Sequence, residues 1–193
     1  MRVLDLFSGL GGFSQAFRDR GHEVVTVDIE ASFRPSIRAD IRHLPIKSSA
    51  RFDVILASPP CDEFAKASMP WLRKDAKPDI TLLKATIRVI NELGPSFWVI
   101  ENVRGAIPFF RPVLGRYRQR CGSRYLWGNF PRFRCEHIKC FGKERLPPSP
   151  LRKALRSRVP YELSLKLCMA IESALRSNLH IVNFQCWEVA PGA

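Results

Sequence analysis

Residues 2–29, RVLDLFSGLGGFSQAFRDRGHEVVTVDI, decide the fold of this chain. A short apolar run over 2–7 ends at the glycine-rich turn 9–12, and the spacing of the apolar residues after it predicts a helix that ends at Gly21. The β-branched run 23–29 predicts a second strand. A strand, a tight glycine turn, a helix and a second strand form the unit from which parallel sheets are built.

The same alternation continues along the chain. Residues 52–57 (FDVILA) and 97–100 (FWVI) predict two further strands, and the apolar positions within 79–93 predict a helix between them. A last helix is expected to begin at Pro160, and residues 180–189 could form a last strand. Strands that are almost wholly apolar, alternating with helices, indicate a Rossmann-like α/β fold, a mostly parallel sheet with helices on both faces.

Chemically distinctive residues follow each predicted strand. The glycine turn 9–12 follows the first, Asp28 ends the second, Pro59-Pro60-Cys61 follows the third and Glu101-Asn102 follows the fourth. The carboxyl ends of parallel strands meet at one edge of a sheet, and ligands bind there. We therefore expect a glycine loop, a carboxylate, a rigidly held thiol and a second carboxyl group to form one site.

Each of these features also has a purely structural interpretation. The glycine spacing is not the dinucleotide fingerprint G-x-G-x-x-G, so the loop and Asp28 could be a tight turn beside a surface acid. Cys61 could be a small buried hydrophobe in a turn, and Glu101 could be a surface acid at a strand end. The functional interpretation makes Cys61 a nucleophile and Glu101 a proton donor.

The positive charge of the chain is concentrated in one segment. The chain has 31 Lys and Arg against 18 Asp and Glu, a net charge of +13. Residues 104–158 contain 15 basic and two acidic residues, which also gives +13, so the remainder is neutral. Segregated charge of this size favours a polyanionic partner, and nucleic acid is the commonest one.

Composition excludes other classes. The sequence has no apolar run long enough for a membrane span and no signal peptide, which predicts a cytoplasmic protein without a membrane partner, either nucleoid-associated or virus-encoded. The six cysteines show no disulfide framework, so structural disulfides are not expected. Cys135, His137 and Cys140, with Cys121 upstream, do not have a usual zinc spacing, which favours unlinked thiols and no metal.

Three segments resemble the motifs of the C5-cytosine DNA methyltransferases, a family of DNA-methylating and restriction-modification enzymes. Residues 5–13 (DLFSGLGGF), 59–61 (PPC) and 101–103 (ENV) look like the first, fourth and sixth motifs, in the same order and at similar spacing. The resemblance covers about residues 1–104. It implies the Rossmann-like fold of methyltransferases that use S-adenosylmethionine and release S-adenosylhomocysteine.

The resemblance assigns a cofactor role to several residues. Asp28 would bind the ribose hydroxyls, with Glu30 as the alternative, and Asp40 with Ile41 looks like the pair that contacts the adenine. The residues assigned to the cofactor are Phe7, Gly9, Gly11, Gly12, Asp28, Ile29, Glu30, Asp40, Ile41 and Pro59.

The resemblance also implies the catalytic residues. Cys61 would attack C6 of a flipped cytosine, while Glu101 would bind N3 and the exocyclic amine. Arg132 and Arg134 resemble the eighth motif without its usual glutamine. They would support the target pocket or its backbone phosphate, and over the pocket they would lower the pKa of the thiol.

The C-terminal half departs from the family pattern. About 25 residues separate Arg134 from Val159, where the family usually has a target-recognition domain of ~100 residues. We expect one methyltransferase domain over 1–193, with a cofactor-binding and catalytic core (1–104), a basic nucleic-acid-facing segment (105–158) and a closing helix packed back on the core (159–178). The closing helix resembles the tenth motif.

The substrate expected from the resemblance is DNA, and RNA is not excluded. Specificity could come from a protein partner or a homodimer. Two other functions stay open: a degenerate, non-catalytic methyltransferase fold that binds nucleic acid, and an amino-methyltransferase for adenine N6 or cytosine N4. Ser58-Pro59-Pro60 fits the amino-methyltransferases, but Cys61 stands where they need an aromatic residue.

Overall fold

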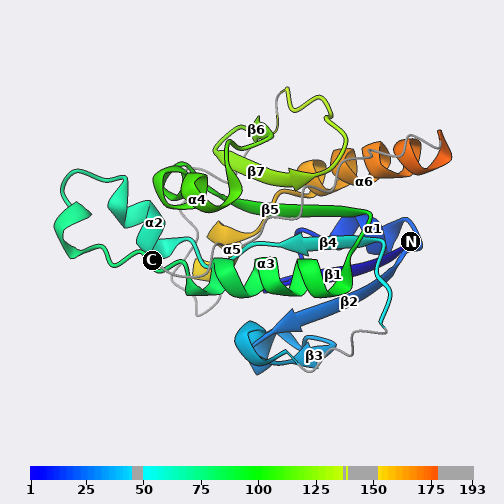
Figure 1. Ribbon diagram of the computed structural model, residues 1–193, viewed down its shortest axis with the longest axis horizontal. Helices are drawn as coiled ribbons and strands as arrows, with labels where there is room; N and C mark the ends of the chain where they lie inside the picture. The colour runs from blue at the N-terminus through cyan, green and yellow to red at the C-terminus, as the bar shows by residue number, and fades with distance from the viewer. Residues whose placement is uncertain (45–49, 137, 139–151, 178–193) are drawn as a thin grey trace.

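The computed structural model describes residues 1–44, 50–136, 138 and 152–177 (Figure 1). Its centre is a sheet of seven strands in the order β3-β2-β1-β4-β5-β7-β6. The strands are β1 (Arg2–Leu6), β2 (Glu23–Asp28), β3 (Ile37–Arg38), β4 (Val54–Ala57), β5 (Phe97–Val103), β6 (Gln119–Cys121) and β7 (Arg124–Asn129). The five strands from β3 to β5 are parallel to one another, and the β6–β7 hairpin joins β5 antiparallel.

Helices cover both faces of the sheet (Figure 1). They are α1 (Gln15–Asp19), α2 (Asp62–Ala67), α3 (Thr81–Leu93), α4 (Ile107–Leu114), α5 (Arg152–Ser157) and α6 (Tyr161–Arg176). Alternate residues of the central strands divide the core in two: Leu4 and Ile55 pack with α2, α3 and α4, while Val3 and Val54 pack with α1 and α6. The predicted architecture is therefore confirmed.

The C-terminal helix α6 is tied to the first helix by hydrogen bonds as well as by apolar packing. The hydroxyl of Ser164 donates to the carbonyl oxygen of Phe13 at 2.6 Å and accepts from the backbone N–H of Ala16 at 3.2 Å. Because both partners lie just after the glycine turn, α6 holds the start of α1 in place.

The structure adds elements that the sequence patterns did not predict. The β6–β7 hairpin and the helices α2, α4 and α5 lie outside the predicted elements, and β5 continues through Glu101 and Asn102 to Val103 because β7 supplies its hydrogen-bonding partner. The strand expected over 180–189 lies outside the described residues. In the described part of the chain, no helix combines the length and apolarity of a membrane span.

Candidate active site

The four parallel strands β1, β2, β4 and β5 bring the predicted functional residues to their common carboxyl edge. The register pairs Leu6 of β1 with Val27 of β2 and with Ala57 of β4, and Ala57 in turn pairs with Ile100 of β5. The residues immediately beyond these four positions are therefore neighbours. They include the glycine turn, Asp28, the Pro-Pro-Cys segment and Glu101, which are the features expected to form one site.

The glycine turn and Asp28 are joined by direct hydrogen bonds. The N–H of Gly9 donates to Oδ2 of Asp28 at 2.8 Å, and the N–H of Glu30 donates to Oδ1 at 2.9 Å. Phe7 and Gly9 have positive φ angles of 59° and 48°, so the chain reverses sharply as it leaves β1. The reversal leaves open space at Gly9, next to the carboxylate.

This arrangement fits the ribose and adenine of S-adenosylmethionine. Each oxygen of Asp28 keeps a lone pair that a ribose hydroxyl can use. The neighbouring side chain, Ile29, is apolar yet 56% exposed, which suits packing against an adenine ring. In contrast, the carboxylate of Asp40 is already paired with Arg42, which holds its pKa at about 2, and Ile41 is buried.

A buried acid that sequence reasoning did not assign to the site lies beneath the glycine turn. Asp5 of β1 accepts a hydrogen bond from the hydroxyl of Ser14 at 2.5 Å on Oδ2, while Oδ1 is buried without a hydrogen-bonding partner among the described residues. Burial raises the pKa of Asp5 to about 7, and the nearby charge of Asp28 adds to this. The sequence signals were an acid inside an apolar strand and its place at the start of the segment 5–13 that resembles the first motif.

Gly12 allows the segment before α6 to approach the glycine turn. A Cβ atom at this position would lie 2.5 Å from Cγ of Arg158 and 2.7 Å from the carbonyl oxygen of Val159. The contact therefore needs glycine because no side chain fits there. Residues 158–159, which lie just before α6, thus pack directly against the glycine turn.

Cys61 is half-buried at the end of the Pro-Pro segment and directly precedes α2. The amide of Asn102 in β5 donates to the carbonyl oxygen of Pro59 at 3.0 Å, so β5 fixes the segment that carries the thiol. Burial raises the pKa of the Cys61 thiol, the charge of Glu101 raises it further and the charge of Arg124 opposes the change. Both side chains are therefore close enough to act on the thiol.

Glu101 forms a buried ion pair with Arg124 of β7. Nη1 of the arginine lies 3.1 Å from Oε1 of the glutamate, and the two side chains are 8% and 4% exposed. Nη2 donates to the carbonyl oxygens of Ser157 and Arg158 at 3.2 and 3.1 Å. Arg124 therefore connects Glu101 to the C-terminal end of α5, a role that sequence reasoning did not give to it.

The structure differs from the sequence prediction for the arginines. Arg132 and Arg134 are both exposed, and neither forms a hydrogen bond or ion pair with Glu101 or Cys61 within the described residues. Arg132 lies near Arg118 instead, since its charge lowers the pKa of that guanidinium, although burial is the larger cause. Arg124 lies beside Glu101 instead, and its charge opposes the rise in the pKa of the Cys61 thiol. A catalytic role of Arg132 and Arg134, with a lowering of the thiol pKa, stays a prediction. A contact of Arg132 and Arg134 with backbone phosphate stays a prediction.

The expectation of unlinked thiols is also corrected. Cys121 at the end of β6 and Cys135 form a disulfide, with their Cα atoms 5.1 Å apart. The antiparallel β6–β7 hairpin returns the chain to Cys121, a proximity that cysteine spacing alone does not reveal. His137 and Cys140 lie outside the described residues.

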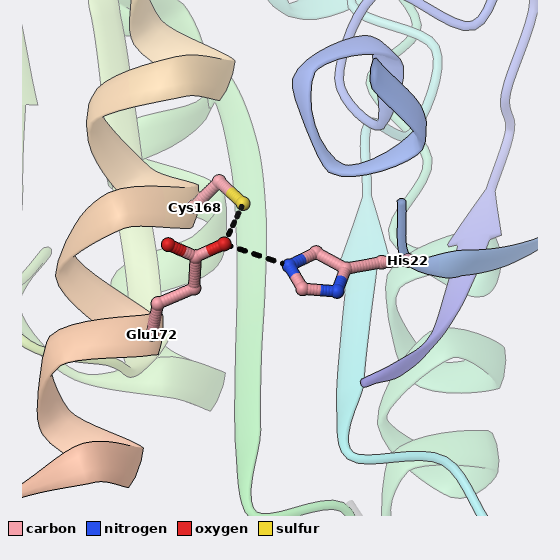
Figure 2. A group of neighbouring side chains, drawn as sticks. All are labelled: His22, Cys168 and Glu172. Atoms are coloured by element: carbon pink, nitrogen blue, oxygen red, sulfur yellow. Dashed lines mark hydrogen bonds and ion pairs between the residues drawn. The ribbon is translucent and has the colours of Figure 1, made fainter. Parts of the chain in front are cut away.

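A second cluster of polar side chains lies away from this edge, between α6 and the start of β2 (Figure 2). Glu172 accepts from Nε2 of His22 at 2.9 Å and from both Nε and Nη2 of Arg20, at 2.9 and 2.7 Å, while the thiol of Cys168 lies 3.8 Å away. The N-terminal ammonium group also contacts His22. The carboxylate is already occupied by Arg20 and His22, so the cluster joins α6 to the segment that enters β2.

The N-terminal half of the chain is similar to known proteins. Residues 1–109 match the family of C-5 cytosine-specific DNA methylases. The chain is 31% identical over 123 residues to the type II methyltransferase M1.HphI of Haemophilus parahaemolyticus, covering 53% of this chain and 32% of that protein. It is 25% identical over 141 residues to the tRNA (cytosine(38)-C(5))-methyltransferase of Rattus norvegicus, covering 65% of this chain and 36% of that protein.

Solved structures that are similar to this chain include the Dnmt2 methyltransferase of S. pombe, with 18% identity and a TM-score of 0.40. The similarity covers 66% of this chain and 50% of that one. The chain spans about a third of the length of the curated relatives just named. The fold is the Rossmann-like fold of S-adenosylmethionine-dependent methyltransferases, and S-adenosylmethionine is the cofactor of the matched family. Because the family match covers more than half of the residues, this chain belongs to the C-5 cytosine-specific DNA methylases.

Proposed function

We propose that this chain methylates C5 of cytosine in DNA, using Cys61 as a covalent nucleophile and Glu101 to bind the target base. One observation carries the proposal: the fold brings Cys61 and the buried Glu101–Arg124 pair to the same sheet edge as the glycine turn and Asp28. The cofactor, bound by the glycine turn, Asp28 and Ile29, would supply an electrophilic methyl group there.

The residues at this edge suit the steps of the reaction. The Cys61 sulfur forms a bond to C6 of the cytosine, and electron density moves into the ring towards C5. Glu101 binds N3 and the exocyclic amine, and a proton shared at N3 neutralises the charge that develops. S-adenosylmethionine bound at the glycine turn would supply the methyl group to C5; its S–CH3 bond would break, and S-adenosylhomocysteine would leave. A base removes the proton from C5, and the C6–S bond breaks to return the thiolate.

Arg124 would keep Glu101 in one orientation through these steps. A single carboxylate on a buried strand can rotate, but the ion pair and the two carbonyl oxygens hold the guanidinium from both sides. Preorganised polar groups of this kind stabilise developing charge without having to move during the reaction. We therefore assign Arg124 as a positioning residue for Glu101.

The substrate is proposed to be DNA because the matched family is described by that activity. Similarity to tRNA methyltransferases makes RNA the natural comparison in any assay. A positively charged surface binds phosphate in either polymer and does not by itself distinguish them. A protein partner or homodimer that provides specificity stays a prediction.

The test uses oligonucleotides that contain 5-fluorocytosine, in DNA and in RNA form, with S-adenosylmethionine. Fluorine at C5 cannot leave as a proton would, so the enzyme should remain attached as an adduct that survives a denaturing gel. Cys61→Ser should abolish the adduct. Cys168→Ala is the matched control, since Cys168 is the other free cysteine in the described part of the chain and lies in α6.

The result separates the alternatives. An adduct with DNA alone supports the proposal, and an adduct with RNA alone replaces DNA as the substrate. Methylation that persists in Cys61→Ser would favour the amino-methyltransferase, which needs no thiol. Binding of nucleic acid without methylation or adduct would favour the non-catalytic module.

A further inference from the structure

The short helix α5 lies at the same end of the sheet as α2 (Figure 1). Lys153 of α5 forms an ion pair with Asp62, the residue that follows Cys61. The ammonium group is also close enough to Cys61 for the thiolate charge to act on it, although Asp62 is the main reason that the pKa of Lys153 is raised. A cation from α5 therefore lies next to the predicted nucleophile, Cys61.

The position of α5 is fixed at its other end by the base-binding pair. Arg124, which is bound to Glu101, donates to the carbonyl oxygens of Ser157 and Arg158 at the C-terminal end of the helix. Arg158 in turn packs against Gly12 of the glycine turn. The C-terminal end of α5 is therefore fixed by Arg124, which is paired with Glu101, and the residue that follows it packs on the glycine turn. The charged side chains of α5 consequently have a defined place relative to the site.

The polar side chains of α5 have one sign of charge. Its sequence, Arg-Lys-Ala-Leu-Arg-Ser, contains three cations and no acid. All three cations are exposed, and Arg152 and Arg156 form no ion pair with any residue in the described ranges. A helix that only covered the core would need no such set, because exposed cations without partners add little to stability.

The ion pair between Lys153 and Asp62 is suited to exchange. The side chains are 79% and 46% exposed, and pairs this exposed contribute only about 0–1 kcal/mol. A phosphodiester can therefore compete for the ammonium group at little cost. Until a phosphate arrives, Asp62 holds the lysine next to Cys61 in a restricted range of positions.

We propose that α5 binds the sugar–phosphate backbone of the substrate, with Lys153 taking a phosphate next to the target cytosine. This proposal rests on the proposed function, because it places the phosphate by reference to Cys61. The ligand chemistry is a phosphodiester of a polynucleotide. Arg152 and Arg156 contact the same strand on either side.

The experiment measures binding of a cytosine-containing duplex DNA oligonucleotide by fluorescence anisotropy over a series of salt concentrations. Each phosphate contact contributes about 0.9 to the slope of log affinity against log salt. Lys153→Ala should reduce the slope by about 1, and Lys153→Arg should restore it. Arg51→Ala is the matched control, because Arg51 is exposed and precedes β4 at the opposite edge of the sheet.

Asp62→Asn gives a prediction of the opposite sign. It releases Lys153 and removes a negative charge from the expected path of the phosphate, so affinity should rise at low salt. Circular dichroism confirms folding of each variant, which is expected because the substituted side chains are exposed. The adduct assay with 5-fluorocytosine is run on the same variants.

An unchanged slope in Lys153→Ala, together with a normal wild-type adduct, would overturn the role of α5 and leave the proposed function intact. Loss of the adduct from the wild type, with a slope that still depends on Lys153, would instead overturn the covalent mechanism and keep the phosphate contact. An equal loss of slope in Arg51→Ala would show that only net charge matters, which also contradicts the proposal.

Discussion

Replacing Arg124 with methionine should destabilise the protein more than any exposed substitution. Methionine has a similar length and fills the space, so the loss is electrostatic rather than a cavity. The change leaves Glu101 on β5, only 3% exposed, without the cation that lies 3.1 Å away. Removing one partner of a buried ion pair costs about 3–5 kcal/mol, because the remaining charge has lost its compensation.

That loss is large for a single domain, whose total stability is about 5–15 kcal/mol. It should appear in urea unfolding at pH 7 as a midpoint shift with little change of slope. The matched variants are Glu101→Gln and the double variant Arg124→Met with Glu101→Gln. In the double variant no unpaired charge remains, so it should be more stable than Arg124→Met alone.

A thermodynamic cycle of these variants isolates the interaction. We expect a coupling energy of at least about 2 kcal/mol, because both side chains are shielded from solvent. A loss below about 1 kcal/mol in Arg124→Met, or a double variant with the summed losses of the two single ones, would refute the reasoning. Either result would mean that Glu101 and Arg124 do not rely on each other, and the positioning role of Arg124 would fall with it.

Three further predictions concern other parts of the structure. Gly12→Ala should lower the melting temperature more than Gly9→Ala, because the new Cβ would lie 2.5 Å from Cγ of Arg158. At Gly9 there is open space, so alanine there would meet only the backbone strain of a φ of +48°, which costs about 1–2 kcal/mol. Equal shifts in melting temperature would contradict the close approach at Gly12. The rate of adduct formation should rise with pH between about 7 and 9, because the pKa of the Cys61 thiol is raised and only the thiolate attacks. A rate that does not change with pH, measured from samples quenched at successive times, would contradict this. Glu172→Gln should lower the free energy of unfolding by about 1–2 kcal/mol at pH 7, because Arg20 and His22 lower the pKa of Glu172 to about 2 and partial exposure screens these pairs. The difference in stability between variant and wild type should vanish in acid unfolding as the pH falls from about 4.5 to 2, where Glu172 becomes protonated.

The central strands could be predicted from short apolar or β-branched runs. β4 is apolar and buried throughout, β1 and β5 contain buried apolar runs, and β2 alternates valine with polar residues, which is a composition typical of strands. Their common carboxyl edge followed from topology alone. The positions of the Pro-Pro-Cys segment and the glycine turn at this edge could be predicted from the strand that each one follows.

The hairpin was not predictable in the same way. β7 is as buried as the central strands at its start, but it lies within a segment rich in arginine, proline and glycine, and β6 has only three residues. Gly128 in β7 has a φ of +139°, and a Cβ there would lie 2.0 Å from the carbonyl oxygen of Trp98. That glycine is explained by the pairing of β7 with β5, which no local pattern reveals.

The role of Arg124 depends on this same pairing. In the antiparallel register Val103 lies opposite Arg124 and Glu101 lies opposite Leu126, so Arg124 and Glu101 are diagonal neighbours on one face of the sheet. A spacing of 23 residues carries no such information. Motif spacing pointed to Arg132 and Arg134 because it compares sequences along the chain, whereas the cation that Glu101 needs is supplied by whichever strand pairs with β5. In a chain whose C-terminal half departs from the family pattern, the register of that strand is therefore a better guide to the arginine that pairs with Glu101 than the spacing of arginines.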